Sequence, residues 1–205
     1  MIIREATDQD WAGIYPFFSA IVAAGSTYAY PEHLSLEGAR PLWMEQPPGR
    51  TVVAVEGDLV VGSAKMGPNR PGRGSHVATA SFMVDPEQVG CGVGRALGEE
   101  VLEWARSAGY RSMQFNAVVE TNTGAVHLWQ ALGFQILTTV PEAFDHREHG
   151  RSPCTSCSKA WLRTNARTMP WIGRRPADRS TGGRVDQRSS GGSHSSSRVP
   201  AGSRT

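Results

Sequence analysis

A glycine-rich segment is the strongest chemical signal in this chain. Gly90, Gly92 and Gly94 alternate with other residues shortly after an apolar strand candidate that ends at Val84, and Arg95 follows them. Glycines let the backbone adopt positive φ and approach a ligand closely, and the N–H groups at the start of a helix favour an anion. The segment therefore predicts a phosphate-binding loop, and a plain helix-capping turn is the alternative.

Two common nucleotide-binding loops do not fit this segment. A dinucleotide-binding fingerprint needs Gly-x-Gly-x-x-Gly directly after a first parallel strand, whereas here the spacing is Gly-x-Gly-x-Gly and five residues separate Val84 from Gly90. A Walker loop is excluded because no Gly-Lys-Ser/Thr follows the glycines.

The elements that must position this loop are predicted to be mixed α/β. Apolar residues at three- and four-residue steps predict helices over about 8–24, 35–43, 94–108 and 123–132. Runs rich in β-branched residues predict strands over 2–4, 51–55, 59–66, 76–84, 112–119 and 134–140. Pro16 and Pro41 are expected to kink or divide the first two helices.

Two motifs, in this order along the chain, resemble the GNAT superfamily of N-acetyltransferases. Val84-Asp85-Pro86 and the glycine segment are similar to the family's acetyl-coenzyme A loop. The stretch from Asn122 to Phe134 is similar to its second signature, Asn-x-x-Ala-x-x-Leu-Tyr-x-x-x-Gly-Phe. The resemblance covers about residues 2–150 and implies a mixed, mostly antiparallel sheet flanked by helices. It implies transfer of an acetyl group from acetyl-CoA to a primary amine of a small molecule, by direct attack in a ternary complex.

The same resemblance implies a coenzyme site. The loop would offer donors to the pyrophosphate, the end of the preceding strand would offer backbone groups to the pantetheine, and the second motif would border the thioester arm. The cofactor-binding residues implied in this way are Phe82, Met83, Val84, Gly90, Cys91, Gly92, Val93, Gly94, Arg95, Asn122, Ala125 and Trp129.

Two positions depart from the family pattern. Val89 precedes the first loop glycine where the family usually has Arg or Gln, which predicts a weaker hold on the coenzyme. Trp129 stands where many members have a Tyr that protonates the leaving thiolate, and an indole N–H is not such an acid. These departures keep open an alternative in which the chain is a catalytically impaired acetyl-CoA-binding protein.

The acceptor side of such a reaction has five candidate residues. An alkyl amine is almost fully protonated at pH 7, so a base would assist its attack, and His76 and Glu120 are the catalytic candidates. Asn116 is a candidate hydrogen-bonding group for the substrate, and Tyr28 and Tyr30 lie in the loop that shapes the acceptor pocket in the family. For each of them a surface or packing role is the alternative reading.

A possible zinc set is present but is not our prediction. His146 and His149, with Cys154 and Cys157, have spacings that zinc ligands use. They straddle a change in composition near Gly150, so we predict no metal site. The three cysteines of the chain are an odd and sparse set, which argues against a disulfide scaffold.

Composition divides the chain near Gly150. Residues 1–150 hold 10 Lys and Arg against 17 Asp and Glu, a balance of −7, whereas residues 151–205 hold 11 against 2, a balance of +9. We therefore expect an acetyltransferase-like domain over 1–150, with no recognisable final strand, and a disordered basic tail over 151–205. One alternative is that the tail arises from out-of-frame translation. Another is that it binds nucleic acid or an acidic partner, although nucleic acid is not the partner we expect.

The remaining expectations concern location and assembly. No apolar run reaches the length of a membrane span, and the first residues lack the pattern of a signal peptide, so we expect a cytoplasmic protein without a membrane partner. The sequence leaves a homodimer open and does not identify the amine.

Overall fold

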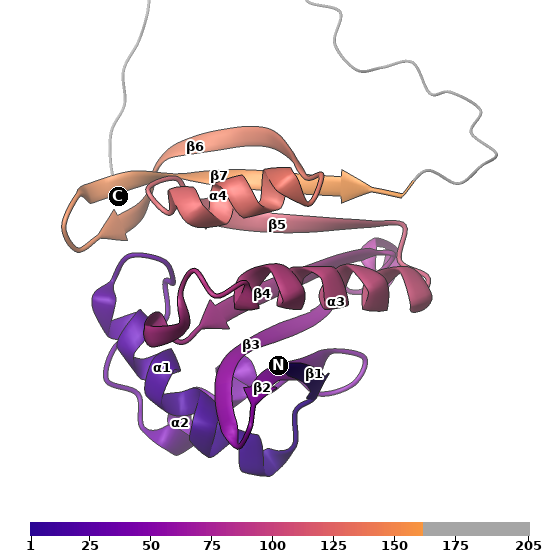
Figure 1. Ribbon diagram of the computed structural model, residues 1–205. Coiled ribbons are helices and arrows are strands. Elements are labelled where there is room, and N and C mark those ends of the chain that lie inside the picture. The colour runs from indigo at the N-terminus through magenta and orange to yellow at the C-terminus, as the bar shows by residue number, and fades with distance from the viewer. Residues whose placement is uncertain (162–205) are drawn as a thin grey trace, which may run out of the picture. The chain divides into compact units, whose positions relative to one another are not determined.

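The computed structural model describes residues 1–161, which contain four α-helices and a seven-stranded sheet (Figure 1). The helices are α1 (Trp11–Ala24), α2 (Leu36–Trp43), α3 (Val93–Ser107) and α4 (Thr123–Ala131). The strands are β1 (Ile2–Glu5), β2 (Arg50–Glu56), β3 (Leu59–Pro68), β4 (Val77–Val84), β5 (Ser112–Val119), β6 (Gln135–His146) and β7 (Gly150–Ala160). Short 3-10 turns, η1 (Asp8–Asp10), η2 (Gly72–Gly74) and η3 (Pro86–Gln88), precede α1, β4 and the glycine loop.

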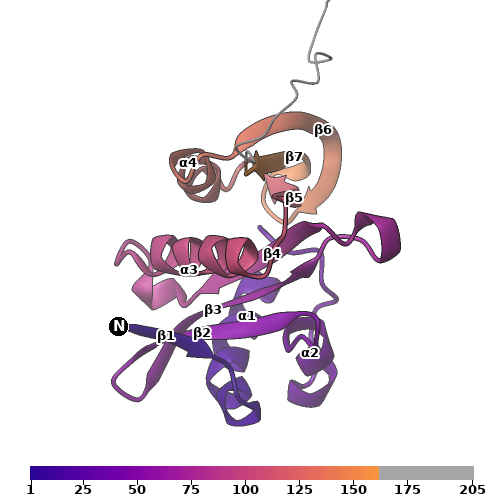
Figure 2. The same cartoon turned by 90° about the vertical axis from the view of Figure 1, so that its right-hand side faces the viewer.

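The strands lie in the order β1-β2-β3-β4-β5-β7-β6. Neighbouring strands are antiparallel except β4 and β5, which pair in parallel. Helices α1 and α2 cover one face of the strands β2 to β4, and α3 covers the other face (Figure 2). The mixed, mostly antiparallel sheet expected from the family resemblance is therefore confirmed.

Each face of the first strands buries its own core. Trp11, Ile14 and Phe18 of α1 pack with Trp43 of α2 against Val53 of β2. On the other face, the apolar stripe of α3 packs against β2, β3 and β5. This stripe consists of Val93, Leu97, Val101, Leu102 and Ala105. The periodicity that predicted these helices is thus the spacing of their buried residues.

The two internal prolines do not divide their helices. Helix α1 runs through Pro16 as one helix to Gly25, whose φ of 61° ends it, and α2 likewise contains Pro41. The β2–β3 hairpin turns at Gly57, which has a φ of 60°.

The expectation that no strand follows Gly150 is wrong for residues 151–160. Strand β7 lies inside the sheet and pairs with β5 on one side and β6 on the other. It buries four small side chains, of which two are polar: Ser152, Cys154, Thr155 and Cys157. Pairing on both edges satisfies the backbone without a run of apolar residues, and that run was the signal sought in the sequence. The rest of the expected tail, 162–205, lies outside the described residues.

In the described part of the chain, no helix is long and apolar enough to cross a membrane.

Candidate functional site

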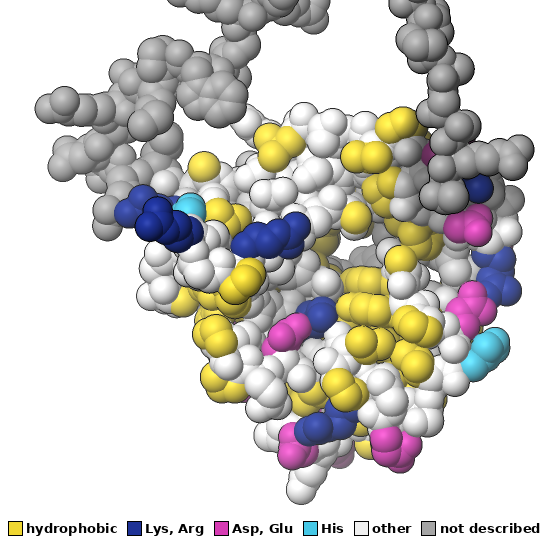
Figure 3. All heavy atoms as spheres, turned by 180° about the vertical axis from the view of Figure 1, so that it is seen from behind, with side chains coloured by type: hydrophobic (Ala, Val, Ile, Leu, Met, Phe, Trp, Pro, Cys, Tyr) yellow, Lys and Arg dark blue, Asp and Glu magenta, His cyan; other side chains and the backbone are white. Residues whose placement is uncertain are grey.

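A cavity of about 1000 Å³ lies where β4 and β5 diverge. Its walls come from the end of α1, the loop after it, β4, the glycine loop, β5, α4, and the strands β6 and β7. Figure 3 shows a hollow near the centre of one face of the molecule, with hydrophobic side chains gathered around it. Residues of the glycine loop and three of the five acceptor candidates, Tyr28, Tyr30 and Asn116, therefore border one continuous space.

The cavity exists because β4 and β5 pair over a very short length. Their parallel pairing joins Val77 to Ser112 and Ala78 to Met113, after which β5 continues beside β7. Asn116 and Ala117 fall in a bulge in the β5–β7 register and line the cavity. The edge of β4 beyond Ala78 therefore faces the cavity, and an open strand edge offers N–H and C=O groups to a ligand.

The glycine loop has the geometry of an anion site. Gly90 and Gly92 have φ of 89° and 82°, and a Cβ built on either would meet nothing within 4 Å. Gly92 is the N-cap of α3, and its helix start receives no hydrogen bond from a side chain of the described residues. Arg95 lines the cavity and is 53% exposed, with Glu99 3.7 Å away. Backbone N–H groups and one cation thus face open space at this end.

The loop residues predicted to contact a coenzyme do not all face the cavity. Gly90, Gly92, Val93, Gly94 and Arg95 line it, whereas Cys91 is exposed and does not. Cys91 lies between Gly90 and Gly92, which both have positive φ.

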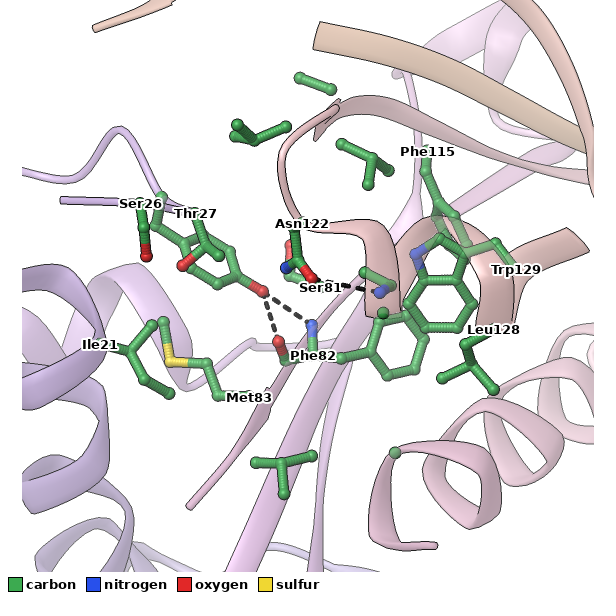
Figure 4. A pocket seen from close by; sticks show the side chains of 18 of the residues that line it. Ile21, Ser26, Thr27, Ser81, Phe82, Met83, Phe115, Asn122, Leu128 and Trp129 are labelled. Carbon is green, nitrogen blue, oxygen red and sulfur yellow. Dashed lines mark hydrogen bonds between the residues drawn. The ribbon is translucent and has the colours of Figure 1, made fainter. Parts of the chain in front are cut away.

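Tyr28 is bonded to the strand edge that was expected to bind pantetheine. Its hydroxyl donates to the carbonyl oxygen of Phe82 at 2.6 Å and accepts from the Phe82 N–H at 3.0 Å (Figure 4). Burial raises the pKa of Tyr28 well above its ordinary value, so the phenol stays neutral. Met83 stands in register with Ser63 of β3. Phe82, one of the three strand residues predicted to bind the coenzyme, therefore has its backbone N–H and C=O both hydrogen-bonded to Tyr28.

An aromatic stack fixes Tyr28 in this position. Its ring lies parallel to that of Tyr30, with centroids 5.4 Å apart, and edge-on to Trp43 at 6.0 Å. Tyr30 in turn stacks on Phe18 at 5.6 Å. The two tyrosines predicted to shape the acceptor pocket both line the cavity and are anchored in the core of α1 and α2.

The α4 side of the cavity is a hydrophobic wall. Trp129 is buried and packs on Phe82 and Phe115, with ring centroids 4.6 and 4.7 Å away. Asn122 lines the cavity and caps α4, its side-chain oxygen accepting from the Ala125 N–H at 3.1 Å. Figure 4 shows Leu128 and Trp129 on one side of Phe82, and Ile21, Ser26 and Thr27 on the other. Phe82 therefore marks the passage between two parts of the cavity.

A second cavity of about 370 Å³ adjoins the first and shares Tyr30 and Asn116 with it. Its charged groups are paired, because Lys65 Nζ donates to Glu45 Oε1 at 3.1 Å and to the Leu42 carbonyl at 2.8 Å. The amide of Asn116, predicted to bind substrate, donates to the side chain of Asn69 at 2.7 Å.

Neither catalytic candidate lines the cavity. His76 is exposed just before β4 begins, where its Nδ1 lies 3.1 Å from the Arg73 carbonyl. It is six residues from Phe82, which corresponds to about 20 Å along an extended strand. Glu120 is also exposed, beyond the end of β5, and its backbone N–H donates to Pro153. The structure does not bring these two side chains to the other site residues.

The histidines and cysteines with zinc-ligand spacing do not converge. Residues 1–161 contain no group of three or more His, Cys, Asp or Glu placed to hold a metal ion. His146 is buried, and its Nδ1 accepts from the backbone N–H groups of Glu148 and His149 in the β6–β7 turn. Cys154 and Cys157 are buried in β7.

The sequence analysis did not predict several of the residues that line the cavity. Ile21 and Ala24 lie on the last turns of α1, and Phe144 and Cys154 lie on β6 and β7. Their helix and strand assignments give no sign that they meet, because the contact depends on how β5, β6 and β7 diverge from β4. The one signal in the sequence is that α1 carries apolar residues outside its buried stripe, such as Ala24, which could line a cavity.

Comparisons with known proteins agree with this geometry. The model of the acetyltransferase (GNAT) family matches residues 14–134, more than half of the chain. A GCN5-related N-acetyltransferase from Kribbella flavida is 54% identical, and the alignment covers 78% of this chain and 97% of that one, with a TM-score of 0.75.

Two other relatives are more distant. The N-acetyltransferase aca1 of Schizosaccharomyces pombe is 37% identical over 75 residues, so the match spans 37% of this chain and only 36% of that protein. The structure of yncA from Salmonella typhimurium, solved with its cofactor acetyl-CoA, is 24% identical over 81% of this chain and 96% of that one. Its TM-score is 0.69, and at this identity the likeness concerns the fold alone.

Proposed function

Because the chain belongs to the acetyltransferase (GNAT) family, we propose that it transfers the acetyl group of acetyl-CoA to the primary amine of a small molecule. The observation that carries this proposal is the continuous cavity from the glycine loop past Phe82 to Tyr28. A volume of about 1000 Å³ leaves room for a donor and an acceptor together in a ternary complex, so direct attack by the amine is feasible.

The residues at the glycine loop suit acetyl-CoA. The open space at Gly90 and Gly92 leaves room for a pyrophosphate against the first N–H groups of α3, and Arg95 adds a positive charge. Val84 and the α4 residues Ala125 and Leu128 line the path toward Phe82, where a pantetheine arm would run. When bound, acetyl-CoA supplies an acetyl group activated as a thioester.

The chain's own contribution is to orient the amine and to exclude water. Phe82, Phe115 and Trp129 form an aromatic wall on one side of the passage. On the other side the neutral Tyr28 hydroxyl keeps a lone pair that can accept from an amine N–H, because it accepts one bond and donates one. Its raised pKa prevents it from acting as a base near pH 7. We propose that the acceptor binds as its neutral form, after losing its proton to water.

A turnover assay tests the proposal. Full-length protein is mixed with acetyl-CoA and a panel of primary amines, thiol release is followed, and the acetylated amine is identified by mass spectrometry. We expect thiol release that depends on the amine, with kcat/KM rising with pH as the neutral fraction of the amine rises. Binding of acetyl-CoA without turnover of any amine would contradict the proposal and favour a protein that only binds the coenzyme.

A further inference from the structure

One part of the cavity has a distinct chemistry. Its walls come from α1, β5, β6 and β7, and we call this part of the cavity the apolar chamber. The apolar chamber consists of Ile21, Ala24, Val119, Phe144 and Cys154. Val119, Phe144 and Cys154 also form a small buried cluster of their own. Burial raises the pKa of the Cys154 thiol, so it stays uncharged and behaves as a small apolar group.

Several charged groups around the two cavities form ion pairs with one another. Arg147 in the β6–β7 turn pairs with Glu32 in the α1–α2 loop at 2.6 Å, and Lys65 pairs with Glu45 in the adjoining cavity. Glu142 and Arg151, on the two strands that flank this turn, lie 3.9 Å apart at the surface. Among the described residues that line the cavity, the charged one is Arg95, on the first turn of α3. Recognition inside the apolar chamber is therefore by apolar contact.

We infer that the acceptor is an amine with an apolar substituent, alkyl or benzylic, which binds in the apolar chamber while the amino group lies beside Tyr28. This inference rests on the proposed function. Each methylene moved from water to such a surface is expected to raise kcat/KM about fourfold, until the apolar chamber is full. A second charge on the substituent would lose its hydration against these walls, so a charged acceptor is expected to react poorly.

A matched series of amines tests the inference on the full chain. Ethylamine, n-butylamine, n-hexylamine and benzylamine form the apolar set, and 1,4-diaminobutane and 4-aminobutanoate match n-butylamine in length but carry a second charge. We expect kcat/KM to rise along the alkyl series and to be at least tenfold lower for both charged compounds than for n-butylamine. A charged compound that matches or exceeds n-butylamine would overturn the inference.

Two neighbouring alanines of α1 provide a variant and its control. Ala24 lines the apolar chamber and Ala23 does not, although both residues are exposed. Ala24→Leu fills part of the apolar chamber and is expected to lower kcat/KM for n-hexylamine at least tenfold more than for ethylamine. Ala23→Leu makes the same change one residue earlier and is expected to leave both values within twofold. Equal losses for both amines in Ala24→Leu, with native thermal unfolding, would contradict the assignment.

The outcomes separate this inference from the proposed function. If charged amines are acetylated better than apolar ones, the inference fails and the proposed acetyltransferase activity stands. If no amine of the series is acetylated although the protein is folded and binds acetyl-CoA, both fail.

Discussion

The two parts of the sheet are held together by different forces. Strands β1 to β4 are sandwiched between α3 and the α1–α2 pair, and β2 buries three consecutive apolar residues, Val52, Val53 and Ala54. In the arm formed by β5, β7 and β6, most of β6 is exposed and β7 buries Ser152 and Thr155. Side-chain burial stabilises the first region, whereas hydrogen bonds between strands supply a larger share of the stability of the arm.

The cavity lies at the seam between these regions. Two residue pairs join β4 to β5, so the seam is the one place in the described sheet where neighbouring strands separate after so short a pairing. The well-packed first region holds the glycine loop, Tyr28 and the α1 residues of the apolar chamber. The arm contributes the other residues of the apolar chamber, and α4 follows β5. A site built in this way has one fixed wall and one wall of lower expected stability.

The largest expected effect compares one phenylalanine from each region. Phe18 is 1% exposed in the α1–α2 core, and Phe144 borders the cavity in the arm. We expect Phe18→Ala to lower the free energy of unfolding by about 3–5 kcal/mol, and Phe144→Ala to cost about half as much because its cluster is small. Urea denaturation of both variants measures this. Equal losses would mean that the arm is packed as well as the first region.

The second prediction concerns pH and lies in the first region. Asp10 accepts hydrogen bonds from Arg4 and Thr7, and the Arg4 guanidinium holds the pKa of this carboxyl well below its usual range. An Asp with a lowered folded pKa stabilises the protein above its unfolded pKa of about 3.9 and loses that contribution as the pH falls.

We therefore expect Asp10→Asn to lower the free energy of unfolding by about 1–2 kcal/mol at pH 7, at the modest end because Arg4 is partly exposed. The difference from the unmodified chain should be constant above about pH 5 and shrink below about pH 4. Denaturation curves at several pH values measure it, and a difference that grows on acidification would be the contrary result.

The smallest expected effect is a gain in the arm. Thr155 is buried in β7, and its hydroxyl lies 3.4 Å from that of Thr139, a weak contact. Thr155→Val keeps the shape and removes a buried polar group, so we expect the free energy of unfolding to rise by up to about 1 kcal/mol. Thermal unfolding tests it. A loss of stability would show that β7 depends on its polar side chains and would argue against out-of-frame translation as their origin.

The sequence predicted the first region better than the arm for a physical reason. Apolar periodicity reports burial, and α1, α3, β2 and β3 are positioned by burial. Strand β7 was missed because its place is set by hydrogen bonds to two neighbours, which Ser, Thr and Cys residues make as well as Val residues do. The glycine loop was predicted because its positive φ angles are local properties of Gly90 and Gly92.

The candidate site was predicted only where its geometry is local. Tyr28 was predicted as an acceptor residue, but no local pattern predicts its hydrogen bond to Phe82, because the two residues are 54 positions apart in the sequence. His76 shares the two-residue period of β4, which predicts a face of the strand but not a distance along it. The apolar chamber depends on the divergence of β5 from β4, which no single segment encodes.

The most direct test of the central claim is a calorimetric titration of acetyl-CoA into the full-length chain and two glycine variants. Gly92 and Gly57 both have positive φ and open space at the Cβ position, but only Gly92 borders the cavity. Replacement of either by Ala is expected to cost a similar amount of stability, about 1–2 kcal/mol. The account predicts one-site binding that is at least tenfold weaker in Gly92→Ala and within twofold of the unmodified chain in Gly57→Ala. An absence of binding by the folded protein, or equal affinity in both variants, would contradict it.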